Sequence, residues 1–136
     1  MDTVIPFYWF DKTGKPDAEA KVREREADVD QGNKIRCRSC EHVISDERQR
    51  ITVDNSHTHN RINPNGVEYY FQCFRAAPGC DTHGIATAEH TWFAGYRWQI
   101  VFCNNCGEHL GWYFQGEASF YGLIIARLVC DADRLA

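Results

Sequence analysis

The amino-acid sequence predicts a mainly β fold, and three observations carry this prediction. From residue 35 onward, short runs of aromatic and β-branched residues alternate with turn-forming segments, a pattern typical of a β domain. The 136 residues suffice for one domain with its own core, although a small core gains from a staple. Two Cys-x-x-Cys pairs, residues 37–40 and 103–106, enclose most of this region and offer such a staple. We therefore expect one β domain over residues 35–136.

The strands of this domain are predicted from local alternation and from the turns between them. The expected strands cover residues 50–53, 67–74, 96–102 and 109–114, and a turn covers residues 63–66. Residues 119–129 are ambiguous, because their apolar centre favours a buried strand while the following Ala-Arg-Leu would tolerate a helical turn. Residues 54–60 carry His57 and His59, and we expect a polar loop there rather than a second metal site.

Residues 1–34 differ in composition from the rest of the chain. An aromatic patch at residues 7–10 precedes a turn-rich linker at 11–16. A charged stretch at 17–30 follows, and its apolar stripe is too narrow to bury much surface. We expect a flexible or loosely docked N-terminal extension, with a partner-binding extension as the alternative. The start of the chain has no basic n-region and no small-residue cleavage site, so we predict no signal peptide and a cytoplasmic protein.

Charge and hydropathy argue against two classes of partner. The formal net charge is −4, and no dense basic block provides the positive footprint of a nucleic-acid-binding protein. No apolar run approaches the roughly 18 residues that a membrane-spanning helix needs. We therefore expect neither nucleic-acid nor membrane binding.

The paired cysteines indicate a metal site. A two-residue gap lets both sulfurs of a pair converge on one ion, and four thiolates suit a closed tetrahedral zinc site. The candidate ligands of a structural Zn²⁺ are Cys37, Cys40, Cys103 and Cys106. Disulfides or a redox dithiol are the alternative, but a redox pair usually opens a helix in a βαβ unit, which this sequence does not show. The other cysteines are expected to be small buried hydrophobes or surface thiols, namely Cys73, Cys80 and Cys130.

Three of the four tryptophans lie between residues 92 and 112. Trp98 falls on the strand before the second cysteine pair and Trp112 on the strand after it, so the two can face each other. Trp92 precedes Gly95 in a turn and could close a third wall, while Phe114 lies on the same face as Trp112. A plain core and a ligand cage both fit this pattern. The density of tryptophan favours the cage, since each indole N–H also needs a partner.

The stretches 89–98 and 103–112, both cysteine pairs and the turn at 63–66 together resemble the CULT domain family, the thalidomide-binding domain of cereblon. The resemblance covers roughly residues 35–129 and implies a β-tent of two antiparallel sheets pinned by a four-cysteine zinc site. It also implies a three-tryptophan cage for a cyclic imide, whose polar edge bonds to the segment 90–92. The implied ligand-binding residues are Asn63, His90, Thr91, Trp92, Trp98, Trp112 and Phe114. Two positions depart from the best-known members, Ala94 in place of proline and Thr91 in place of serine.

We therefore expect a single-domain, zinc-stapled binding module and not an enzyme. Its guests would be cyclic imides of the glutarimide or thalidomide type, uracil-like rings, or C-terminal cyclic imides of damaged proteins. No ubiquitin-ligase adaptor surface is expected in this chain. Methionine sulfoxide reductase B shares both cysteine pairs but needs a reactive cysteine, and residues 119–122 have none. The remaining alternatives are a Yippee-like protein-interaction domain and a cage for a methylated ammonium, which would use cation–π attraction.

Overall fold

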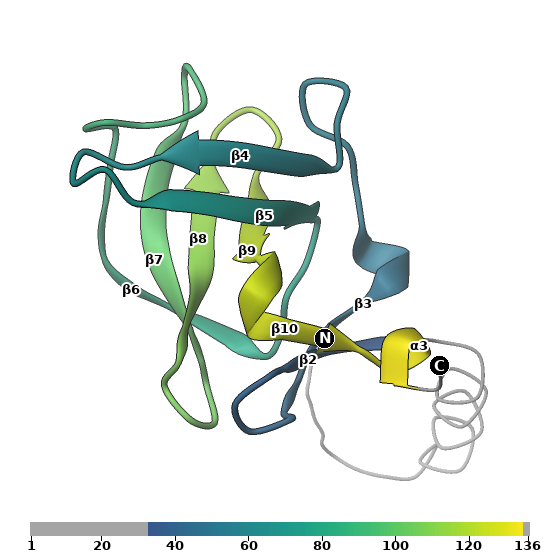
Figure 1. Ribbon diagram of the computed structural model, residues 1–136. Helices are drawn as coiled ribbons and strands as arrows, with labels where there is room; N and C mark the ends of the chain where they lie inside the picture. Colours follow the sequence, from purple (N-terminus) through teal and green to yellow (C-terminus); the bar gives the residue numbers. More distant parts are fainter. Residues whose placement is uncertain (1–32, 135–136) are drawn as a thin grey trace, which may run out of the picture. The chain divides into compact units, whose positions relative to one another are not determined.

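The computed structural model describes residues 33–134, which form a mainly β structure with two antiparallel sheets (Figure 1). The small sheet has the order β10-β2-β3, formed by Leu128–Cys130, Lys34–Cys37 and Val43–Asp46. The large sheet has the order β4-β5-β9-β8-β7-β6, formed by Thr58–Ile62, Glu68–Phe74, Phe120–Ile124, His109–Gln115, Arg97–Cys103 and Cys80–Thr87. The predicted fold class is confirmed.

Three short helical segments complete the described part of the chain: η1 (Glu47–Gln49), η2 (Ile125–Arg127) and α3 (Asp131–Arg134). Between residues 33 and 134, no helix is long and apolar enough to cross a membrane. Residues 1–32 and 135–136 lie outside the described residues. The expected extension over residues 1–34 therefore falls almost wholly outside them, and the boundary at residue 35 stays a prediction.

Strands β7 and β8 fulfil the prediction for residues 96–102 and 109–114, and they carry the tryptophans. Their antiparallel register places Trp98 opposite Phe114 and Ile100 opposite Trp112. Trp112 and Phe114 belong to one buried aromatic cluster, and Trp98 and Ile100 pack against it, as period-two alternation requires of residues on one face. The two strands therefore present one continuous aromatic face.

The prediction of a strand at residues 50–53 is wrong. Arg50 and Val53 make only isolated bridges, to Phe74 and Ser56. Asp54 and Asn55 adopt positive φ angles of 51° and 69°, which suit the two central positions of a tight reverse turn. Two hydrogen bonds between the backbones of Val53 and Ser56, of 2.8 and 3.1 Å, close this turn. The chain therefore reverses before these residues can extend into a strand.

The polar loop expected at residues 54–60 is only half correct, because strand β4 begins at Thr58. His59 is buried on this strand, where its ring stacks on Phe71 with the centroids 5.6 Å apart. Its Nε2 lies 3.0 Å from the carbonyl oxygen of Val53 and 3.1 Å from that of Ser56. These hydrogen bonds offset the cost of burying an imidazole, so a polar sequence forms an inner strand face.

Residues 119–129 combine both expected conformations. Strand β9 ends at Ile124, the short helix η2 turns the chain, and β10 then pairs with β2 in the small sheet. This segment therefore connects the two sheets directly.

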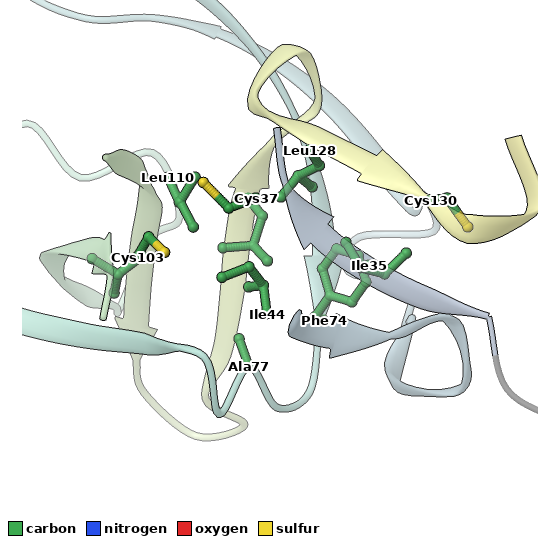
Figure 2. Packing of buried hydrophobic residues seen from close by; sticks show 11 residues of the cluster. Ile35, Cys37, Ile44, Phe74, Ala77, Cys103, Leu110, Leu128 and Cys130 are labelled. Atoms are coloured by element: carbon green, nitrogen blue, oxygen red, sulfur yellow. The ribbon is translucent and has the colours of Figure 1, made fainter. Parts of the chain in front are cut away.

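Two clusters of buried residues form the core. The sheet-junction cluster draws on both sheets, and Figure 2 shows Cys37 and Cys103 among its aliphatic side chains. It comprises Ile35, Cys37, Ile44, Phe74, Ala77, Val101, Cys103, Leu110, Leu123, Leu128 and Cys130. The aromatic cluster comprises Phe71, Cys73, Phe93, Trp112, Phe114, Phe120 and Ile124. Full burial of a large apolar side chain contributes about 1.5–3 kcal/mol to stability. The sheet-junction cluster, which draws on both sheets, therefore holds the sheets together, and the aromatic cluster supports the tryptophans.

Candidate functional site

Each cysteine pair lies in a turn with the same backbone hydrogen bonds. The first follows β2, where the N–H of Cys37 donates to His42 O (2.9 Å) and that of Glu41 donates to Cys37 O (2.7 Å). The second joins β7 to β8 and repeats this pattern, from Cys103 to Glu108 O (2.8 Å) and from Gly107 to Cys103 O (2.9 Å). The two turns bring one pair from each sheet to a common point.

The four sulfurs fit a tetrahedral metal ion. All lie within 4.8 Å of one another. Cys37 Sγ lies 3.6 Å from Cys106 Sγ, and Cys40 Sγ lies 3.6 Å from Cys103 Sγ. A zinc ion with Zn–S bonds of about 2.3 Å would place its tetrahedral sulfurs about 3.8 Å apart. Four thiolates leave no open coordination position, so the cluster forms a structural zinc site, as predicted.

The surroundings of Cys40 favour the thiolate that a metal ligand requires. A hydrogen bond from the Asn105 side chain and another from the His42 backbone lower the pKa of the Cys40 thiol to about 6. Asn105 belongs to the second cysteine turn, so the second turn helps prepare Cys40 of the first turn for the metal.

Two of the remaining cysteines, the buried Cys73 and the half-buried Cys80, have no ligand role. Burial raises the pKa of Cys73 and of Cys80 to about 12, so both stay protonated near neutral pH. Cys130 is buried in the sheet-junction cluster. None of the three belongs to the metal cluster found among residues 33–134.

A pocket of about 450 Å³ opens beside the aromatic face of the large sheet. Its volume is in the range typical of small-molecule sites. Its lining comprises Asn63, Pro64, Asn65, Tyr69, Thr87, Glu89, His90, Trp92, Trp98, Ile100, His109, Trp112 and Phe114. The structure thus brings together six of the seven residues implied as ligand-binding, all except Thr91.

The three tryptophans come from separate elements and are fixed by different contacts. The Trp92 ring meets Trp112 edge to face, with centroids 4.8 Å apart at 76°, and stacks on Phe71 at 5.6 Å. Its Nε1 donates to Ile62 O over 3.3 Å. Trp98 Nε1 donates to Glu89 O over 2.8 Å. Both indole N–H groups are therefore satisfied by backbone carbonyls, one at the end of β4 and one in the loop after β6, which leaves the flat ring surfaces as walls.

Asn63 has a structural task in addition to lining the pocket. Its Oδ1 accepts hydrogen bonds of 2.9 Å from the N–H groups of Asn65 and Val67, at the turn between β4 and β5. This acceptor is committed to the turn, so only the amide Nδ2 remains for a guest.

Thr91 acts within the loop between β6 and β7. Its Oγ1 donates to Phe93 O over 3.3 Å and accepts from Phe93 N over 3.4 Å, and the side chain does not line the pocket. His90 does line it, in an exposed position with a positive φ of 59°, and its Nε2 lies 3.9 Å from Glu89 Oε2. Thr91 therefore shapes the loop that presents its neighbours.

The sequence interpretation missed several lining residues, and some of them had a signal. Ile100 and Tyr69 lie two positions from Trp98 and Phe71, so strand periodicity would have placed them on the same faces. His109 had no such signal, because it lies an odd number of positions from Trp112. A β-bulge at Leu110 in β8 brings both residues to the pocket.

The fold and site define a mainly β domain with a four-cysteine zinc site beside an aromatic pocket. No family model matches the chain. It is similar to cereblon from Gallus gallus, with 38% identity over 74 residues, which cover 50% of this chain and 17% of the relative. Cereblon from Danio rerio is 34% identical over 53 residues (39% of this chain, 12% of the relative). Cereblon from Drosophila willistoni is 47% identical over 32 residues (24% and 5%).

These matches, together with the four-cysteine cluster, support the predicted resemblance to the cereblon-like CULT domain. The similar segment is a small part of cereblon, since the chain spans 17% or less of the length of these three relatives.

Proposed function

We propose that this domain is a binding module for a small neutral ring, a cyclic imide or a related uracil-like ring. One observation carries the proposal: three indoles, from one loop and two strands, line a single pocket of about 450 Å³. Flat indole faces suit the methylene face of a small ring, while a few polar groups at the rim would fix its orientation. The similarity to cereblon supports this choice of guest.

The loop before β7 supplies polar groups for the edge of an imide. Among residues 33–134, the backbone N–H of Trp92 has no hydrogen-bond acceptor. An imide carbonyl could accept from this group, and the imide N–H could donate to the adjacent backbone or to His90. A buried imide edge without such partners would lose about 1–3 kcal/mol per unpaired group, so these contacts would discriminate an imide from an apolar ring.

The pocket volume leaves room beyond a single six-membered ring. A ring attached to a longer chain, such as a cyclic imide at the C-terminus of a damaged protein, would therefore fit with its chain leaving through the opening. We propose that the domain binds its guest and does not catalyse a reaction on it. A cytoplasmic location and the lack of a ubiquitin-ligase adaptor surface in this chain remain predictions.

An enzyme of the methionine sulfoxide reductase B type is disfavoured by the lining of the pocket. The lining residues include no cysteine. Burial raises the thiol pKa of Cys73 and of Cys80 to about 12, which removes their nucleophilic form at neutral pH. A methylated ammonium is the competing guest, because aromatic cages also bind cations.

Titration of tryptophan fluorescence tests the proposal. The full chain is titrated with glutarimide, succinimide, uridine and trimethyllysine, and again as the Trp98→Ala variant. We expect glutarimide to change the emission saturably, with affinity reduced about tenfold or more in the variant, because a desolvated wall residue typically contributes 2 kcal/mol or more. The variant should retain its zinc, since Trp98 lies outside the cysteine turns. Binding of trimethyllysine but not of glutarimide would contradict the proposal.

A further inference from the structure

The end of the pocket nearest the second cysteine turn is formed by His109. Its ring meets Trp112 edge to face, with centroids 5.4 Å apart at 88°. Phe102 packs near the same imidazole with the centroids 5.8 Å apart. The orientation of His109 therefore bears directly on one wall of the pocket.

Both ring nitrogens of His109 have partners that fix its tautomer. Nε2 lies 3.1 Å from Gly111 O, and because a carbonyl oxygen only accepts, Nε2 must carry the proton. Nδ1 lies 3.3 Å from Arg127 Nη1, which only donates, so Nδ1 must be the unprotonated acceptor. The same guanidinium nitrogen also donates to His109 O over 2.8 Å. These contacts describe a neutral imidazole with its Nε2 protonated.

The charges around His109 favour the same neutral form. Burial lowers the pKa of His109, and the positive charge of Arg127 lowers it further. Gly111 O and Glu108 act in the opposite direction, but the carboxylate of Glu108 lies 4.0 Å from Arg127 Nε and so pairs with the guanidinium. A second proton on Nδ1 would face the Arg127 donor and break their hydrogen bond.

Arg127 is itself held by the first cysteine turn. The backbone N–H of Arg38 donates to Arg127 O over 2.9 Å. The Arg38 side chain donates to Ala126 O over 3.1 Å and to Leu128 O over 2.9 Å. Three consecutive carbonyls around Arg127 are thus bonded to one residue between Cys37 and Cys40, which limits how far Arg127 can move.

We propose that His109 and Arg127 are positioning residues of the pocket. Arg127 holds His109 in one tautomer and one orientation, so that the imidazole supports the Trp112 wall and offers the guest no free donor or acceptor. The pocket is then selective at this end for the apolar part of a neutral ring. The expected effect on guest affinity rests on the proposed function. The tautomer of His109, in contrast, can be measured without any guest.

The test compares Arg127→Met with Arg36→Met in the zinc-loaded full chain. Arg36 is a matched control, because it is a similarly half-buried arginine on β2, paired with Asp131 of α3, and it does not line the pocket. The ring-nitrogen chemical shifts of His109 report its tautomer. We expect wild type and Arg36→Met to show the Nε2-protonated form, and Arg127→Met to show a mixture that protonates at higher pH. Glutarimide affinity should fall about 3- to 10-fold in Arg127→Met alone, as expected for the loss of one or two hydrogen bonds.

Arg127→Lys serves as the conservative variant and carries the test if Arg127→Met does not fold. A lysine at position 127 keeps the positive charge and can donate a hydrogen bond. Compared with Arg127→Met, this variant should therefore regain part of the preference for the Nε2-protonated tautomer and part of the glutarimide affinity. An unchanged His109 tautomer and unchanged affinity in both Arg127 variants would overturn the inference. If wild type shows the single tautomer but binds no ring compound, the proposed function fails while the positioning of His109 by Arg127 still stands.

Discussion

Replacing Gly111 by alanine should push strand β8, which carries Trp112, away from the neighbouring strand β9. Gly111 lies on β8 opposite Leu123 of β9, with a φ of 154°. A Cβ at this position would lie 2.0 Å from Gly122 O, where ordinary contact begins near 3.4 Å, so the strands must move apart by about 1.4 Å. Overpacking of a core costs about 1–3 kcal/mol, and an unfavourable backbone conformation adds about 1–2 kcal/mol. We expect a total of about 2–5 kcal/mol.

Gly84→Ala is the matched control. Gly84 also has a positive φ, of 84°, but a Cβ there would meet no atom within 4 Å, so only the backbone cost of about 1–2 kcal/mol remains. Chemical denaturation of the zinc-loaded proteins measures both costs, and thermal unfolding should separate the variants by about 4–8 °C per kcal/mol. Glutarimide binding should weaken only in Gly111→Ala. If the two substitutions destabilise the domain equally, the close approach of β8 to β9 is not a constraint and the reasoning is refuted.

Three further predictions concern the metal, a charged cluster and the support of the cage. Cys103→Ser should lose zinc and unfold the domain, because zinc binding contributes an apparent free energy of roughly 10–16 kcal/mol to the folding of small domains. Metal analysis and circular dichroism measure the two effects. Cys130→Ser, which leaves the four metal ligands in place, is the folded control. Hydrogen bonds from Arg48 hold the pKa of Asp46 well below its usual range. The folded-state pKa is depressed, so the contribution of Asp46 is present above about pH 4 and is lost at lower pH. Asp46→Asn should therefore cost about 1–3 kcal/mol in denaturation at pH 7, with a penalty that shrinks below pH 4. Phe71→Leu removes the ring that stacks on Trp92, and should cost about 1–3 kcal/mol and weaken glutarimide binding in fluorescence titrations.

The elements that the sequence predicted well are those in which local pattern and tertiary environment agree. Strands β5, β7 and β8 are rich in aromatic residues, and each of them places side chains in the buried core. The four metal ligands followed from spacing alone, because a two-residue gap has a direct geometric meaning. The three tryptophans could be placed on neighbouring elements for the same reason, once the second cysteine pair was seen to join two strands.

The elements that the sequence did not reveal depend on partners far along the chain. The sequence predicts a polar loop over the first residues of strand β4, because the carbonyl oxygens of Val53 and Ser56 that accept hydrogen bonds from His59 come close to it only in the folded chain. Strand β6 forms an exposed edge and lacks an apolar pattern. The place of His109 in the pocket depends on the bulge at Leu110, which no period-two pattern contains. Each failure marks a site where tertiary contacts override local preference.

The most direct test of a preformed imide pocket is a ¹H–¹⁵N correlation spectrum of the zinc-loaded chain, titrated with glutarimide. The indole N–H signals report on each tryptophan separately. We predict that the assigned signals of Trp92, Trp98 and Trp112 shift together along one saturable binding curve, without wider changes in the backbone signals of the small sheet. Saturation with these three indole signals unmoved would place the guest elsewhere and contradict the account.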